Sequence, residues 1–129
     1  MADRGTEPVQ LDGALATFEE AWAPRIVARY NGNEVMVAKA RGRFLWHAHP
    51  ETDDLFLVLG GRLRIELRES GAERSVTLGP GDLYVVPAGV EHCPVAEPEA
   101  DLLLIEPAGT PNTGDPATAV TKPDIEVPR

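Results

Sequence analysis

Short apolar runs separated by turn residues occupy most of the chain between residues 25 and 106. In the most regular run, Leu63, Ile65 and Leu67 alternate with charged side chains, as in a strand with one buried face. The predicted strands are residues 26–30, 34–40, 44–48, 55–59, 63–67, 75–78, 83–86, 90–95 and 102–105. About nine short strands at this regular spacing predict an all-β sandwich or barrel.

The region before the strands has a different apolar period. Apolar residues recur there at steps of three and four, from Leu11 to Trp22. This spacing is typical of one face of a helix. We therefore predict a single helix over residues 11–23, which Asp12 caps and Pro24 ends.

The composition changes at both ends of the chain. Residues 1–10 are polar, and we expect them to be loose. Residues 107–129 are rich in proline and poor in large apolar side chains, which predicts an extended tail. The 129 residues are enough for one core, so we expect a single domain whose barrel lies within 25–106.

Charge and cysteine content limit the partners and the compartment. Twenty-one acidic and twelve basic residues give a net charge of −9, which argues against binding to nucleic acid or to an anionic membrane surface. No apolar run is long enough for a membrane helix, and the polar N-terminus shows no signal peptide. The single cysteine, Cys93, cannot form an internal disulfide, so we expect a buried thiol in a cytoplasmic protein.

The three histidines of the chain fall in two short motifs. His47 and His49 are two residues apart on a predicted strand, so their side chains share one face. His92 follows a Pro-Ala-Gly turn, and acidic residues including Glu51 and Asp54 follow the first pair. Three imidazoles and a carboxylate suit a divalent transition metal such as Fe, Mn, Ni, Co or Zn.

Both histidine motifs resemble sequence motifs of the cupin superfamily. The first motif is matched by Gly42, His47, His49, Asp54 and Gly61. The second is matched by Gly81, Pro87, Gly89 and His92. The resemblance covers roughly residues 35–106 and is strongest to small single-domain bacterial cupins described as mannose-6-phosphate-isomerase-like. It implies an antiparallel β-barrel of the RmlC-like jelly-roll type, with a metal ion in its mouth.

The same resemblance implies that His47, His49, Asp54 and His92 are the metal ligands. Asp54 stands where the family has glutamate, and its side chain is one methylene shorter. Glu51 is the second choice, as metal ligand or as acid and base, and a site without any carboxylate ligand stays open.

Alternation along the predicted strands identifies a candidate pocket wall. If the ligand side chains point inward, so do residues two or four positions away. The wall predicted in this way is Arg43, Leu45, Phe56, Val58 and Val90. Tyr84 is added as a wall or rim residue, although no ligand on its own strand fixes its direction. The apolar members either form barrel core or contact a substrate, and Arg43 is either an anion anchor or a surface charge.

The same alternation directs Phe44, Trp46, Leu55 and Leu57 outward. Apolar side chains on an outer sheet face need cover, from the N-terminal helix or from a second subunit. Because cupins commonly pair, the resemblance favours a homodimer.

Two functions are consistent with this pattern. The first is a metal-dependent enzyme that acts on a small organic molecule, as an oxygenase or as an isomerase or cyclase. The second is a cupin that binds or senses a metal or small ligand without chemistry. Neither the substrate nor the reaction follows from the residues.

Overall fold

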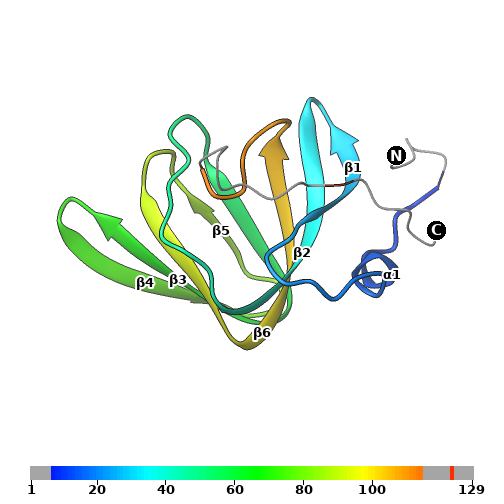
Figure 1. The fold of residues 1–129 in the computed structure, drawn as a ribbon, viewed down its shortest axis with the longest axis horizontal. Coiled ribbons are helices and arrows are strands. Elements are labelled where there is room, and N and C mark those ends of the chain that lie inside the picture. Colours follow the sequence, from blue (N-terminus) through cyan, green and yellow to red (C-terminus); the bar gives the residue numbers. More distant parts are fainter. Residues whose placement is uncertain (1–6, 115–122, 124–129) are drawn as a thin grey trace.

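The computed structural model describes residues 7–114 and residue 123. In these residues one helix and six strands follow one another (Figure 1). They are α1 (Leu11–Leu15), β1 (Arg25–Tyr30), β2 (Asn33–Arg43), β3 (Asp54–Glu69), β4 (Ala72–Leu78), β5 (Leu83–Val86) and β6 (Glu91–Pro107). All strand pairs are antiparallel, in the order β1-β2-β6-β3-β4, and β5 pairs with β3. The predicted all-β class is confirmed.

The two longest strands, β3 and β6, each unite two of the predicted strands. At the middle of β3 the register shifts on both sides of Gly60 and Gly61. Gly61 has a φ of +75°, and a Cβ there would overlap the carbonyl oxygen of Glu99 on β6. Glycine at this point therefore lets β3 bend against β6 and continue, where the sequence had predicted a turn.

The bends divide the sheet into two arms that face each other. In the first arm, residues 55–58 of β3 pair with residues 102–105 of β6, flanked by β1, β2 and β5. In the second arm, residues 63–68 of β3 pair with 91–96 of β6, flanked by β4. In Figure 1 the arms meet at the bend of β6, at the foot of the view, and are open at the opposite side.

The core lies between the arms. Alternate residues of both long strands point inward, so that the burial of β3 alternates along most of its length. The largest fully buried apolar side chains include Met36, Leu63, Ile65, Leu67 and Leu102. This apolar interior holds the arms at a fixed distance, and so it fixes the positions of the residues at the open side of the barrel.

The helix is shorter than predicted. It begins at Leu11 but ends at Leu15, not at residue 23. Ala21 forms a bridge with Lys39 of β2, and the Trp22 amide donates to the Lys39 carbonyl at 2.8 Å. This pairing with the sheet replaces helical hydrogen bonds before Pro24, so tertiary contacts outweigh the helical period.

Two other features complete the described fold. Ala14 and Leu15 of α1 pack with Phe18 over Val27 and Val37, on the outer face of β1 and β2. After β6, Thr110 and Thr113 are buried, so the first part of the predicted tail packs on the barrel. Residues 115–122 and 124–129 of that tail, and residues 1–6, lie outside the described residues. In the described part, no helix is long and apolar enough to cross a membrane.

Candidate metal centre

The segment that carries His47 and His49 lies alongside the start of β6 and is hydrogen-bonded to it. The amide of His47 donates to the His92 carbonyl at 3.0 Å, and the His92 amide donates back at 2.8 Å. Further on, the Gly89 amide donates to the His49 carbonyl at 2.8 Å. These backbone bonds place the three imidazoles together at the mouth of the second arm.

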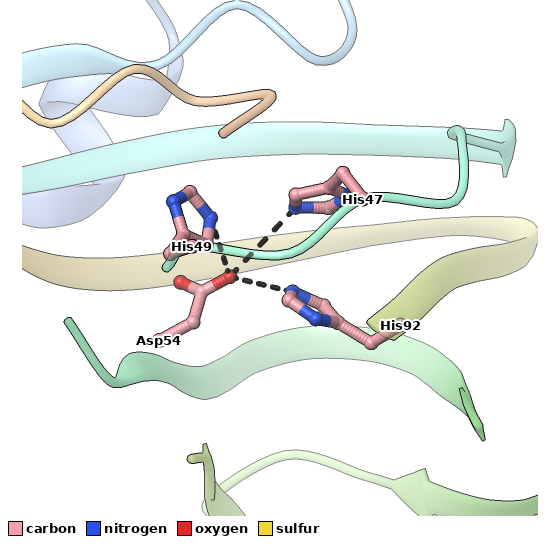
Figure 2. A group of neighbouring side chains, drawn as sticks. All are labelled: His47, His49, Asp54 and His92. Carbon is pink, nitrogen blue, oxygen red and sulfur yellow. Dashed lines mark hydrogen bonds and ion pairs between the residues drawn. The ribbon is translucent and has the colours of Figure 1, made fainter. Parts of the chain in front are cut away.

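Asp54, the first residue of β3, reaches them from the first arm. Its Oδ2 atom lies 2.9 Å from His92 Nε2, 3.2 Å from His49 Nε2 and 3.9 Å from His47 Nε2. Figure 2 shows the three rings and the carboxylate directed toward one another. All four side chains are buried, so the cluster joins the two arms across the open side of the barrel.

Backbone carbonyls fix the orientation of two rings. His47 Nδ1 lies 3.0 Å from the Leu45 carbonyl, and His92 Nδ1 lies 2.9 Å from the Val90 carbonyl. A carbonyl only accepts, so each Nδ1 carries a hydrogen and, in the neutral ring, the Nε2 lone pair faces the cluster. The close pair of His92 Nε2 and Asp54 Oδ2 then needs a proton or a metal cation between its two acceptors.

The pKa values fit the ligand forms of these groups. Burial, helped by neighbouring His92, lowers the pKa of His47 to about 4, so its imidazole is neutral near pH 7. Burial acts to raise the pKa of Asp54, but hydrogen bonds with His49 and His92 outweigh it and hold the pKa at about 2. A neutral imidazole and a charged carboxylate are the forms that bind metal.

The spacing of the four groups also fits one ion. One ligand atom from each residue can be chosen so that all four lie within 4.8 Å of one another. Two atoms bound to one ion at about 2.0–2.1 Å are separated by at most about 4 Å. Small side-chain rotations are therefore enough to bring all four into one coordination shell.

A cavity of about 40 Å³ adjoins the cluster. Its lining is mostly apolar and aromatic: Trp22, Pro24, Ala38, Phe44, His47, Asp54, Phe56, Pro94, Leu102, Leu104, Glu106 and Asn112. Trp22 stacks on Phe44 with ring centroids 4.9 Å apart, and Phe44 meets the His47 ring edge-on at 5.3 Å. One wall is thus a series of rings that ends at a candidate ligand.

Two predicted wall residues, Arg43 and Leu45, do not line this cavity. Leu45 is 40% exposed, and Arg43 pairs with Glu66 at 2.7 Å on the surface. The cause is one extra residue between the Phe44–Pro94 backbone bond and the His47–His92 bridge, which reverses the alternation. Phe44, predicted to point outward, therefore lines the cavity beside His47.

The other predicted wall residues lie on the inner side of the barrel. Phe56 lines the cavity, and Val58 is fully buried in the core. Tyr84 and Val90 are partly buried against the core, where the Tyr84 hydroxyl accepts a bond from Arg74 at 3.3 Å.

Glu51, the second-choice ligand, its neighbour Asp53 and the cysteine lie apart from the cluster. Glu51 is exposed, and Asp53 accepts a hydrogen bond from the Ala88 amide at 2.9 Å. Cys93 is buried, as predicted, and burial raises the pKa of its thiol.

Three cavity residues that carry polar side-chain atoms, Trp22, Glu106 and Asn112, were not predicted. Trp22 had been placed in a helix and Asn112 in the tail. Glu106 follows Leu102 and Leu104 at two-residue steps, so alternation along β6 was a usable signal for its inward direction.

Comparison with known families supplies the assignment. The profile of the Cupin domain family matches residues 33–106, more than half of the chain. The chain belongs to the cupin family. The cupin match contains all four residues of the cluster and ends at Glu106.

Three proteins illustrate how this cupin relates to others. The uncharacterized protein YdbB of Bacillus subtilis is 32% identical over 66 residues, 51% of this chain and 56% of YdbB. A cupin-2 domain protein of Shewanella frigidimarina is 36% identical, with a TM-score of 0.72 over 77% of this chain and 93% of that one. Hydroquinone 1,2-dioxygenase of Sphingomonas sp. TTNP3, solved with 4-nitrophenol, is 23% identical with a TM-score of 0.72. The match spans 91% of this cupin and 38% of the dioxygenase chain, and the two share a fold.

Proposed function

We propose that this cupin binds one divalent transition metal through His47, His49, Asp54 and His92 and acts there on a small organic molecule. The reaction is of the oxygenase or of the isomerase or cyclase type. The observation that carries the proposal is the convergence of three imidazoles on a buried carboxylate beside a cavity. Fe, Mn, Ni, Co and Zn all suit this mixed nitrogen and oxygen set.

The chain's own residues supply the binding and the orientation. His47 and His92 are held by the carbonyls of Leu45 and Val90, and Asp54 balances part of the positive charge. The mostly apolar cavity wall favours an apolar substrate. A bound divalent metal would supply Lewis-acid or redox chemistry at this place.

The alternative is a cupin that holds a metal or a small ligand without turnover. It is favoured by the small number of acid–base groups in the cavity. Among the described lining residues, Glu106 is the one titratable side chain that does not belong to the cluster. The dioxygenase shares only the fold, so it supports a barrel that can house such chemistry and does not choose between the two functions. Membership of the mannose-6-phosphate-isomerase-like group stays a prediction.

Elemental analysis of the purified protein tests the metal proposal. We expect about one metal ion per chain, and removal of that ion by a chelator. His49→Ala should prevent reloading, whereas Glu51→Ala, an exposed acid of the same segment, should load like the wild type. A chain that holds no metal even after reconstitution would refute the proposal. Product formation from candidate substrates by the loaded form, lost in His49→Ala, separates the enzyme from the binding protein.

We propose in addition that this cupin forms a homodimer. On β5, Leu83 is 56% exposed and Val85 is 39% exposed, and their β3 partners Leu57 and Leu55 are only partly buried. An outer apolar face of this kind is typical of an interface. Light scattering should give twice the mass of one chain, and Leu83→Asp should give the mass of one. A single-chain mass for the wild type at micromolar concentration contradicts the dimer.

A cytoplasmic location is the remaining part of the proposal. It is supported by the lone buried thiol of Cys93, which suits a reducing compartment. Fractionation of the native host with an antibody against the chain tests it, and recovery outside the cytoplasm would refute it.

A further inference from the structure

We propose that the cavity beside the cluster binds a small uncharged molecule with an apolar body and one hydroxyl group, and that Glu106 and Asn112 recognise the hydroxyl. This inference deepens the proposed function and rests on it, because the ligand would lie next to the metal. The support comes from the fixed aromatic wall, the buried acceptor, the charge of the lining and the segment that carries Asn112.

The aromatic wall is fixed in place. The Trp22 backbone has a φ of +58°, in the left-handed region that bulky residues rarely adopt. Its amide donates to the Lys39 carbonyl at 2.8 Å, and its indole Nε1 donates to the Arg41 carbonyl at 2.9 Å. With its one polar group bonded to β2, the indole offers the cavity only its apolar surface, on which an apolar ligand can pack.

Glu106 supplies a buried acceptor in the same cavity. It is 3% exposed and occupies an inward position of β6, two residues after Leu104. Its two carboxylate oxygens offer about four acceptor sites, so it can accept a ligand hydroxyl in addition to its bonds within the protein. The Asn112 side chain, with both donors and an acceptor, lines the same cavity.

The charge of the lining selects against anions. Among the described lining residues there are two carboxylates, Asp54 and Glu106, and no lysine or arginine. Arg43, which had been considered as an anion anchor, is paired with Glu66 on the surface. A ligand carboxylate or phosphate would find no positive partner among these described side chains and would lie beside two acidic ones.

Asn112 is positioned by contact with the segment that carries the histidines. The Gly114 amide donates to the Pro111 carbonyl at 3.0 Å, which closes a tight turn around Asn112 and Thr113. A Cβ on Gly114 would overlap the carbonyl oxygen of Ala48, the residue between His47 and His49. Gly114 therefore packs directly on the segment that carries the histidines, and the turn that holds Asn112 lies beside it.

The size of the cavity restricts the ligand further. A volume of about 40 Å³ is enough for about three water molecules, at roughly 10–15 Å³ each. A ring compound such as phenol exceeds this volume, so we expect only its hydroxyl end to enter the cavity and its ring to extend along Trp22 and Phe44.

The fluorescence of Trp22 provides a direct test of binding. The other tryptophan, Trp46, is not among the residues that line the cavity. The Arg68 guanidinium lies over the Trp46 ring, 3.8 Å from the ring centroid. In a Trp46→Phe background, phenol serves as the small flat probe with a hydroxyl and fluorobenzene as the probe without one. In the zinc-loaded protein we expect saturable quenching by phenol and at least about tenfold weaker binding of fluorobenzene. Benzoate is titrated into metal-free protein, prepared with a chelator, because a bound metal could hold its carboxylate. In this metal-free form, benzoate should bind at least about tenfold more weakly than phenol.

Variants connect the preference to the two residues. Glu106→Gln should lower the affinity for phenol about tenfold and leave the affinity for fluorobenzene unchanged. Because the substitution removes the negative charge, it should also reduce the difference in affinity between phenol and benzoate. Glu99→Gln, the same change at an exposed position of β6, should alter none of these affinities. Asn112→Ala gives the second test and carries it alone if Glu106→Gln does not fold, as judged by its thermal transition.

The outcomes separate this inference from the proposed function. Equal binding of phenol and fluorobenzene, benzoate binding as tight as phenol, or variants that behave like Glu99→Gln would overturn it. Zinc is measured in the same samples by elemental analysis. Protein that loads zinc but shows no preference for phenol contradicts only this inference, whereas protein that cannot load zinc contradicts the proposed function.

Discussion

The two arms of the barrel have the same strand alternation but bury different groups. In the second arm, the inward residues of β3 are Leu63, Ile65 and Leu67, all at most 1% exposed. In the first arm, the inward series of the same strand ends at the mouth with Asp54. One continuous strand is thus sealed by apolar packing in one half and carries a charged group of the site in the other.

The difference teaches where this barrel can hold polar groups. Asp54 is only 6% exposed, and burial without partners would make its charge costly. His49 and His92 from the opposite arm provide those partners. Polar side chains are therefore buried where side chains of the opposite arm can form hydrogen bonds with them. The stretch of β3 in the second arm has inward side chains that face the core, and these are apolar.

The largest expected effect lies in the sealed arm. Ile65→Ala should lower the free energy of unfolding by about 2–5 kcal/mol, because a fully buried side chain leaves a cavity. The metal affinity of the folded variant should stay near that of the wild type, since Ile65 is not among the cluster residues. Denaturant unfolding and metal titration measure the two quantities. Loss of metal binding by a folded Ile65→Ala would show that the arms do not act separately.

Acid should weaken the mouth more than the sealed arm. The pKa of His47 falls from an ordinary value of 6.5 to about 4 on folding, so the unfolded chain binds more protons in this range. Stability of the metal-free protein should therefore be full above about pH 6.5 and fall by up to roughly 3 kcal/mol as the pH drops to 4. Unfolding curves over this range measure the slope, and His47→Gln should flatten it. An unchanged slope in that variant would assign the acid sensitivity to other groups.

The carboxylate of the first arm should matter to the metal more than to the fold. Asp54→Asn keeps the shape but removes the charge, and we expect metal affinity to fall about 10–100-fold. Glu51→Gln removes an exposed carboxylate and should leave the affinity unchanged. Competition with a chelator of known affinity gives both values. The opposite result would make Glu51 the ligand.

The smallest effect tests the reversed alternation. Leu45→Ala should change stability by no more than about 0.5 kcal/mol and leave metal affinity intact, because its side chain lies at the surface and is 40% exposed. The contact that holds His47 comes from the Leu45 backbone carbonyl, which the substitution keeps. A loss of several kcal/mol would show that Leu45 points into the barrel after all.

The elements with regular alternation were predictable from the sequence. The β class followed from strands such as β4 and β5, where turn residues separate short apolar runs. The His-x-His pair and His92 were found because motif spacing carries their chemistry, and the structure brings both together with Asp54.

The remaining features depend on contacts between distant residues. The bend at Gly61 requires the approach of Glu99, which no local pattern contains. The early end of α1 requires the pairing of Ala21 with Lys39. The reversal between Phe44 and His47 arises from their bonds to β6, so strict alternation along the sequence assigned Arg43 and Leu45 to the wrong side.

The packing of Gly114 on Ala48 has a consequence for where this domain ends. The match to the family profile ends at residue 106, before Asn112 and the turn that holds it. A protein shortened at that boundary would keep every candidate metal ligand and lose Asn112 from the cavity lining. The boundary of the family is therefore not the boundary of the pocket, and sequence changes in residues 110–114 can alter what the site accepts while the metal ligands stay the same.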